Sequence, residues 1–327
     1  MCQFQTQSPK VMRRNSLTQV WRSGIVTAML LGILGGTFSG LPTARAASLT
    51  ISGASSDQIS LQITDDADQW YRIETSIDLQ EWRIAMESWG PNADLQLSLT
   101  PEQAVIFRAV NIPIPEPPYR LAITGDSTAV GIAGQAEHTL GWGQPLVDHL
   151  HPDARMMIAG EPGLSTKTFF TTRWPGNLER AQPHVVLIQL GQLDEYSRAI
   201  EIKRTSFAEY RDNLAGIVHF VRSWNGIPVL VTPLPWRDFQ PDGTLDPHLE
   251  ERSETMRTTA RELGVALIDL HSLVAEEYRS RPWDELALWS YNDLYHMSIE
   301  GAKEVAKIAI RELPPHLRKL LFEDNLD

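Results

Sequence analysis

Three residues of the chain have the types and the order that acyl transfer by a serine requires. Ser127 follows a short apolar run and opens a Gly-Asp-Ser-Thr turn, while Asp293 and His296 lie three positions apart in the carboxyl-terminal region. A serine hydroxyl is a weak nucleophile at neutral pH, so it needs a histidine to accept its proton and a carboxylate to orient that histidine. We therefore predict that Ser127, His296 and Asp293 form a catalytic triad.

The segments around these residues predict the elements that position them. The run at 119–124 is typical of a buried parallel strand, whose carboxyl end is where open α/β sheets place their chemistry. Strand-like and helix-like segments then alternate, which predicts an α/β domain with a mostly parallel sheet. We predict strands at 119–124, 155–158, 184–190, 227–232 and 265–268, and helices at 138–150, 206–224, 248–263 and 298–312.

Residues 1–46 predict a cleaved export signal. Arg13, Arg14 and Arg22 precede an apolar stretch that ends in the small-x-small site Ala44-Arg45-Ala46, an order typical of secretory signals. A membrane anchor is the alternative, but glycine and serine interrupt the stretch repeatedly. The paired arginines also fit twin-arginine export. We expect a periplasmic or extracellular protein with no membrane attachment after cleavage.

Charge and cysteine content limit the partners and the sources of stability. The formal net charge is −12, and it becomes −17 when the five basic residues of the signal are removed. An acidic balance of this size argues against nucleic acid or an anionic membrane as the main partner. The single cysteine, Cys2, lies inside the signal, so we expect the mature protein to depend on its hydrophobic cores alone.

Residues 47–115 predict a small all-β, sandwich-like module that ends in a proline-rich linker. Apolar and polar residues alternate with period two, as in half-buried strands. Trp70, Tyr71, Trp82 and Trp89 either fill the core of this module or form a sugar-stacking face. We favour the core because a module this small needs large apolar side chains. The α/β domain then occupies residues 116–327.

Several ordered motifs resemble those of the SGNH/GDSL hydrolase family, and most closely its rhamnogalacturonan acetylesterase-like branch. The resemblance extends from Tyr119 to about Pro314. Its motifs are Gly125-Asp126-Ser127-Thr128, Gly141-Trp142-Gly143-Gln144, Gly163-Leu164-Ser165-Thr166-Lys167-Thr168-Phe169, Val229-Leu230-Val231-Thr232-Pro233 with Arg237, Leu267-Ile268-Asp269-Leu270-His271, and Asp293-Leu294-Tyr295-His296.

This resemblance implies an SGNH-hydrolase-like three-layer fold and a serine esterase. Ser127 would attack an ester carbonyl, His296 would act as base and then as acid, and Asp293 would orient His296. The oxyanion would meet the backbone N–H groups of Ser127 and Gly163 and, in the family, an asparagine side chain. The implied substrate is an acylated polysaccharide or oligosaccharide that loses acetyl or another short acyl group, with no cofactor.

The chain departs from the family at the position of that asparagine, where the stretch is Gly191-Gln192-Leu193-Asp194. Leucine cannot donate a hydrogen bond, and one missing oxyanion donor costs roughly a hundredfold to a thousandfold in turnover. Gln189 or Gln192 could supply an amide, although neighbours in an extended segment point to opposite faces, which disfavours Gln192. Residues that we expect to support the site or contact substrate also include Asp126, Trp142, Asp194, Trp236 and Arg237.

Three other functions use the same residues. A non-catalytic glycan-binding protein would explain Leu193, and a lipase or thioesterase would use the same triad. Such lipases usually need an apolar channel or lid, for which only Trp236, Trp283 and Trp289 are available. A metal site would use the residues Asp126, Asp194, Asp293 and His296, but no His-x-x-x-His or cysteine pair supports it. We predict an esterase without a metal ion.

Overall fold

The computed structural model describes residues 20–23, 26–34, 48–54, 58–64, 69–90, 94–98, 105–132, 134–195 and 202–323. The chain divides into two compact units. The first takes its residues from 1–69, 73–83 and 91–111, and the second from 70–72, 84–90 and 112–327. The predicted boundary near residue 115 stays a prediction, but two β-rich segments that precede it, 70–72 and 84–90, belong to the second unit.

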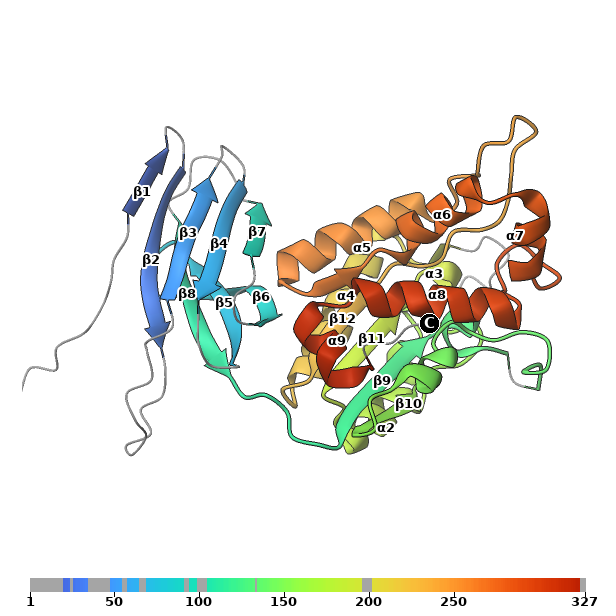
Figure 1. The fold of residues 1–327 in the computed structure, drawn as a ribbon, viewed down its shortest axis with the longest axis horizontal. Helices are drawn as coiled ribbons and strands as arrows, with labels where there is room; N and C mark the ends of the chain where they lie inside the picture. Colours follow the sequence, from blue (N-terminus) through green and yellow to red (C-terminus); the bar gives the residue numbers. More distant parts are fainter. Residues whose placement is uncertain are drawn as a thin grey trace, which may run out of the picture. The chain divides into compact units, whose positions relative to one another are not determined.

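Two sheets take their strands from residues 20–112, which include the predicted all-β region and part of the predicted export signal (Figure 1). One is antiparallel, with the order β3 (Ser48–Ala54), β4 (Gln58–Thr64) and β7 (Asp94–Ser98). The other has the order β1 (Val20–Ser23), β2 (Val26–Leu34), β8 (Val105–Ile112), β5 (Trp70–Ser76) and β6 (Arg83–Trp89). Ile59, Leu61 and Ile63 of β4 are fully buried, as the period-two alternation predicts.

The predicted export signal overlaps β1 and β2. These two strands are antiparallel, and β2 pairs in parallel with β8. Cys2 lies outside the described residues. In the part of the chain that the structure describes, no helix combines the length and the apolar character needed to cross a bilayer.

Two of the four aromatic residues singled out in the β-rich region lie in a core. Trp70 and Tyr71 are 3% and 2% exposed. Trp82 is only partly buried, and the guanidinium of Arg108 lies 3.9 Å from the centroid of its ring. The side chain of Trp89 lies outside the described residues. Trp70 packs in a core of the second unit, to which Tyr71 also belongs. The buried positions favour a core role over a sugar-stacking face, but the core that Trp70 fills is not that of the predicted small β module.

The two segments that belong to the second unit, 70–72 and 84–90, are held by specific contacts. The rings of Trp70 and His316 meet edge to face with centroids 4.9 Å apart. The carboxylate of Glu87 forms ion pairs with Arg72 and Arg222, and its backbone N–H donates to the carbonyl of Gly264 at 2.8 Å. The alternation of Tyr71, Ile73 and Thr75 predicts β5 correctly, but it carries no information about which residues this strand packs against.

A five-stranded parallel sheet forms the centre of the second unit, as predicted. Its order is β10 (Ala154–Ile158), β9 (Tyr119–Gly125), β11 (Val185–Gln189), β12 (Ile227–Val231) and β13 (Ala266–Ile268). Every residue of β11 and β12 is buried, as expected for strands covered on both faces. Gln189 pairs with Gly125 at the carboxyl end of the sheet.

Helices cover both faces of this sheet (Figure 1). Alternate strand residues enter two different cores, so that Val186 and Ile188 of β11 pack on one side and Val185 and Leu187 on the other. The first core includes α2 (Trp174–Ala181), α4 (Phe207–Arg222) and α5 (Glu250–Leu263). The second includes α6 (Leu270–Ser280), α7 (Trp283–Trp289), α8 (Ile299–Glu312) and α9 (Pro315–Leu321).

The helix predicted at 138–150 is wrong. Only the 3₁₀-helix η1 (Pro145–His149) forms there, because the preceding residues run close against the turn that carries Ser127. A Cβ atom on Gly141 would lie 2.3 Å from the backbone of Ala129, and one on Gly143 would lie 2.7 Å from Ile123. Glycine is needed at both positions for this close approach.

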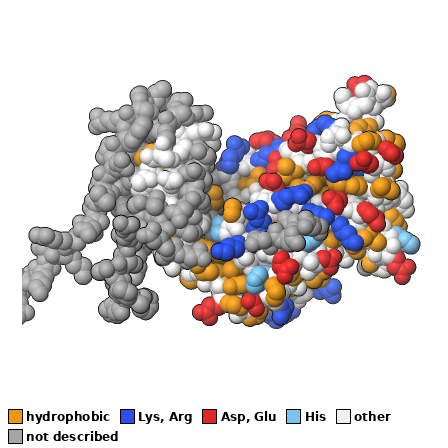
Figure 2. Space-filling view, viewed as in Figure 1, with side chains coloured by type: hydrophobic (Ala, Val, Ile, Leu, Met, Phe, Trp, Pro, Cys, Tyr) orange, Lys and Arg blue, Asp and Glu red, His pale blue; other side chains and the backbone are white. Residues whose placement is uncertain are grey.

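The surface of the second unit carries charges of both signs. On the face seen in Figure 2, acidic and basic side chains are interspersed with apolar ones. The net negative charge of the chain is therefore not gathered into a single patch on this face.

Candidate active site

Ser127 is the first residue of the short helix α1 (Ser127–Val130), directly after β9. Asp126 caps this helix. Its Oδ1 accepts one hydrogen bond from the backbone N–H of Thr128 at 2.9 Å and one from the Thr128 hydroxyl at 2.8 Å. A Cβ atom on Gly125 would lie 2.7 Å from both Ala129 and Gln189. Glycine is therefore needed at residue 125, where β9 ends and the turn places the Ser127 hydroxyl at the edge of the sheet.

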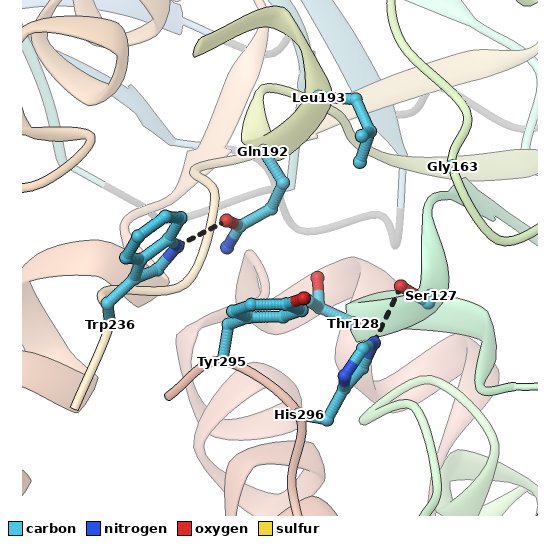
Figure 3. A pocket seen from close by; sticks show the side chains of 8 residues that line it. All are labelled: Ser127, Thr128, Gly163, Gln192, Leu193, Trp236, Tyr295 and His296. Carbon is cyan, nitrogen blue, oxygen red and sulfur yellow. Dashed lines mark hydrogen bonds between the residues drawn. The ribbon is translucent and has the colours of Figure 1, made fainter. Parts of the chain in front are cut away.

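The structure brings Ser127, His296 and Asp293 together. His296 Nε2 lies 2.9 Å from Ser127 Oγ, and His296 Nδ1 lies 2.6 Å from Asp293 Oδ2 (Figure 3 shows the first contact). Asp293 Oδ1 accepts from the backbone N–H groups of Tyr295 and His296 at 2.9 and 2.7 Å. These contacts have the geometry of a nucleophile, base and orienting carboxylate. Their catalytic roles stay a prediction that activity measurements test.

The pKa values of the two carboxylates beside Ser127 are shifted in opposite directions. Burial alone would raise the pKa of Asp293, but hydrogen bonds from the side chain and backbone of His296 and from Tyr295 lower it to about 2. Burial raises the pKa of Asp126 to about 6, against the opposing hydrogen bonds from Thr128. Asp293 is therefore fully ionised at neutral pH and can hold the Nδ1–H of His296.

The loop after β10 brings Gly163 to the site. Gly163 has φ +80, a conformation that favours glycine, and Lys203 Nζ donates to its carbonyl at 2.8 Å. Asp194 holds the same loop, since it accepts from the backbone N–H and the hydroxyl of Thr166 at 3.0 and 2.5 Å. Asp194 is fully buried, which makes it a support for the loop and not a substrate contact.

The backbone N–H groups of Ser127 and Gly163 are the predicted oxyanion donors, and both residues line a cavity. Within the described part of the chain, neither the N–H of Ser127 nor that of Gly163 donates a hydrogen bond to another group. Ser127 is at the first turn of a helix, where N–H groups have no intrahelical acceptor.

A cavity of about 130 Å³ opens beside Ser127 (Figure 3). Leu193 lies in its wall in place of the family's asparagine and contributes apolar surface. Tyr295, which sequence reasoning treated only as a spacer between Asp293 and His296, also lines it. The lining residues are Ser127, Thr128, Gly163, Gln192, Leu193, Trp236, Tyr295 and His296.

Gln189 does not line the cavity. Its Oε1 accepts from the indole N–H of Trp142 at 2.9 Å and lies 3.2 Å from the Thr128 hydroxyl, and its Nε2 donates to the carbonyl of Thr232 at 3.3 Å. Gln189 and Trp142 are both fully buried. The expectation that Gln189 supplies an oxyanion donor is therefore not met, and the two residues support the floor of the site.

Gln192 is also engaged elsewhere, for a reason that the sequence did not indicate. Gln192 begins the helix α3 (Gln192–Glu195), so it does not lie in an extended segment as predicted. Its Nε2 donates to the carbonyl of Leu234 at 2.8 Å, and its Oε1 accepts from the indole N–H of Trp236 at 2.7 Å (Figure 3). The amide of Gln192 thus holds Trp236 at the cavity wall.

Arg237 differs from Trp236 in that it supports the site without lining it. It is 6% exposed, and its guanidinium donates to the backbone carbonyls of Asp293 and His296. Trp236 packs between His248 and Tyr295, with ring centroids 4.1 and 5.5 Å apart. Among the described residues, no group of three or more His, Cys, Asp or Glu side chains is arranged to hold a metal ion.

Comparison with known proteins identifies the family of the chain. The GDSL-like lipase/acylhydrolase family matches residues 123–303, which is more than half of the chain. The chain belongs to this family. It is 26% identical over 210 residues to the rhamnogalacturonan acetylesterase RhgT of Bacillus subtilis (strain 168), an alignment that covers 58% of this chain and 88% of that protein. The family and this relative identify a carboxylic ester hydrolase.

Solved structures show the same fold. The YXIM protein of Bacillus subtilis has a TM-score of 0.51 and 17% identity, with 90% of this chain and 98% of that chain covered. A GDSL-like lipase from Parabacteroides merdae ATCC 43184, described as putative, has a TM-score of 0.51 and 18% identity, with 61% and 97% covered. The predicted SGNH-type α/β fold is confirmed.

Proposed function

We propose that the protein removes acetyl or another short acyl group from a carbohydrate through an acyl-enzyme on Ser127. The observation that carries this proposal is the hydrogen-bonded series Ser127 Oγ, His296 Nε2, His296 Nδ1 and Asp293 Oδ2 at the mouth of a cavity. The family and the rhamnogalacturonan acetylesterase relative support the reaction class.

Acylation begins when Ser127 Oγ attacks the carbonyl carbon of the ester and its proton passes to His296 Nε2. Asp293 keeps the Nδ1–H of His296 in place and stabilises the imidazolium that forms. The negative charge on the carbonyl oxygen meets the N–H groups of Ser127 and Gly163. When the intermediate collapses, His296 returns the proton to the sugar oxygen, which leaves as the alcohol.

Deacylation repeats these steps with water. His296 Nε2 takes a proton from the water as the oxygen attacks the acyl-serine carbonyl, and the second intermediate collapses to a carboxylic acid and free Ser127. The protein thus ends each cycle with the proton back on Ser127 and releases acetate when the acyl group is acetyl.

The size of the cavity favours a short acyl group. Its volume of about 130 Å³ is below the range of roughly 300–1,000 Å³ that holds drug-sized ligands. A fatty chain would have to extend beyond it. This favours a carbohydrate acetylesterase over a lipase or a thioesterase.

Leu193 affects the rate and not the type of reaction in this proposal. With Gln189 and Gln192 held by other groups, the oxyanion is met by two backbone donors and faces the leucine side chain. If the wild-type protein has no turnover at this site, the alternative is a glycan-binding protein of the same fold.

The proposed function also includes export of the protein after cleavage of residues 1–46. Cleavage after Ala46 would remove β1 and β2 and leave β8 at the edge of its sheet. Mass spectrometry of protein from the native host should find a mature amino terminus near Ala47. An intact chain in the membrane fraction would show an anchored protein instead.

Acetate release from polysaccharides tests the reaction. Wild-type protein and Ser127→Ala should be compared on acetylated pectin, acetylated xylan, p-nitrophenyl acetate and p-nitrophenyl octanoate. We expect Ser127-dependent acetate release from one polysaccharide and little activity on the octanoate. Polysaccharide binding without hydrolysis would support the glycan-binding alternative, and faster cleavage of the octanoate would support a lipase.

A further inference from the structure

The turn that carries both His296 and Asp293 lies outside the helices and strands of the second unit. It follows α7 and precedes α8. Met297, the residue after His296, forms isolated bridges with Leu140 and Ser290, and its carbonyl accepts from the Thr139 hydroxyl at 2.5 Å. Small displacements of a catalytic group are costly, since a shift of about 1 Å can reduce turnover by about a hundredfold. The distance of 2.9 Å between His296 Nε2 and Ser127 Oγ therefore depends on what fixes this turn.

Inside the turn, the carboxylate of Asp293 accepts the N–H groups of Tyr295 and His296. These bonds fix the shape of the turn and the pair of Asp293 with His296. They do not attach the turn to the sheet that carries Ser127. That attachment needs a group from another segment.

Arg237 provides three hydrogen bonds from outside the turn. Its Nη2 donates to the carbonyls of Asp293 at 2.8 Å and His296 at 2.6 Å, and its backbone N–H donates to the carbonyl of Leu294 at 2.8 Å. Arg237 follows β12, a strand of the sheet that also contains β9 and the turn of Ser127. It therefore links the turn to the part of the protein that fixes the nucleophile.

The side chain of Arg237 is itself fixed. It is 6% exposed, and its guanidinium carbon lies 5.9 Å from the ring centroid of Tyr278 on α6. A guanidinium presents several N–H donors in one rigid plane, whereas an ammonium on a flexible stem does not. One nitrogen can thus serve two carbonyls at the two ends of the Asp293 to His296 turn.

We propose that Arg237 is a positioning residue for ester hydrolysis, which holds the Asp293 to His296 turn so that His296 stays within reach of Ser127. This inference rests on the proposed function. Removal of the guanidinium should leave the pair of Asp293 with His296 formed but displace both from Ser127. The chemical step should therefore slow while binding of the ester changes little.

Wild type, Arg237→Ala and Arg237→Lys should be compared on p-nitrophenyl acetate, with Arg222→Ala as the matched control. Arg222 is also largely buried and donates to a backbone carbonyl, that of Leu263 at 2.7 Å, but it lies at the end of α4 that precedes the amino end of β12. We expect kcat of Arg237→Ala to fall by about tenfold to a thousandfold with KM changed by less than about threefold. Arg222→Ala should lose stability but keep kcat.

Guanidinium ion at about 50 mM, far below denaturing concentrations, should restore part of kcat in Arg237→Ala and none in Ser127→Ala. A folded Arg237→Ala variant with wild-type kcat, or one whose loss appears only in KM, would overturn the proposal. If Arg237→Ala does not fold, the test uses Arg237→Lys, with Arg222→Lys as its control. The two lysine variants are compared at a temperature at which both are folded. The proposal requires a larger fall in kcat for Arg237→Lys than for Arg222→Lys. Wild-type protein without Ser127-dependent activity would refute the proposed function itself, which separates the two failures.

Discussion

The indole N–H of Trp236 donates a 2.7 Å hydrogen bond to Oε1 of Gln192, and Nε2 of the same amide donates to the carbonyl of Leu234 at 2.8 Å, so Gln192 is held in the cavity wall by both ends of its amide. The other amide nearby, that of Gln189, lies below the site. Leu193 is therefore the position at which an oxyanion donor can be restored by a single substitution.

We expect Leu193→Asn to raise kcat on acetyl esters by about tenfold to a thousandfold, the range set by the value of one oxyanion donor. Leu193→Ala is the matched control, because it shortens the side chain without adding a donor and should not raise kcat. Steady-state kinetics on p-nitrophenyl acetate measure both. Equal kcat in wild type and Leu193→Asn would mean that the new amide does not reach the oxyanion or that another group already fills this role.

Ser127→Ala and His296→Ala should each reduce kcat by at least about a thousandfold with the fold unchanged, because Ser127 and His296 act as a unit. The double variant should lose no more than either single variant. Circular dichroism checks the fold, and hydrolysis of p-nitrophenyl acetate checks the rate. Independent, multiplicative losses would show that the two side chains do not act together.

Asp293→Asn tests the carboxylate through pH. The pKa of Asp293 is about 2 in the folded protein, below the ordinary 3.8, so its contribution to stability is fully present above pH 3.8 and is lost as the pH falls through 2. We expect Asp293→Asn to lower the free energy of unfolding by about 1–2 kcal/mol at pH 7 and by less at pH 3. Urea unfolding at several pH values measures this. A difference that does not change with pH would show that the carboxylate charge is not involved.

Asp293→Asn should also reduce kcat by about a thousandfold to ten-thousandfold, since an asparagine favours the wrong tautomer of His296. A rate within tenfold of the wild type would remove Asp293 from the mechanism.

Glu87→Gln tests the segment 84–90 as part of the second unit. Glu87 is 3% exposed and pairs with Arg72 and Arg222. Removing one partner from a buried ion pair costs about 3–5 kcal/mol. In the more exposed pair with Arg281, Glu277→Gln should cost less than about 1 kcal/mol. Urea unfolding compares the two, and equal effects would mean that Glu87 is solvated in the folded protein.

His316 predicts a second dependence of stability on pH. Burial lowers its pKa to about 4, below the ordinary 6.5, so folding is weakened as the pH falls from 6.5 towards 4. We expect the free energy of unfolding to fall by about 1–3 kcal/mol over this interval in the wild type and by less in His316→Gln. Identical pH dependence in the two proteins would exclude His316 as the cause.

The sequence predicted the strands of the parallel sheet within one or two residues because apolar runs such as 185–189 are buried on both faces. It also paired Ser127 with His296, since both lie in ordered family motifs. The hydrogen-bond partners of the Gln189 and Gln192 side chains could not be predicted. They are the backbone carbonyls of Thr232 and Leu234, which follow β12, a different strand from the one that precedes the two glutamines. Periodicity reports which face of an element is buried, but not which carbonyl lies opposite a given amide.

Four residues of the site, apart from the turn that carries Asp293 and His296, come from four different strand ends. Ser127 follows β9, Gly163 follows β10, Leu193 follows β11 and Arg237 follows β12, and parallel pairing brings these ends to one edge. Each loop can therefore diverge by mutation while the sheet keeps the others in place. Leu193 lies on the short helix α3 that follows β11, so a substitution there alters one wall of the cavity and leaves the strand ends before Ser127 and Gly163 in place.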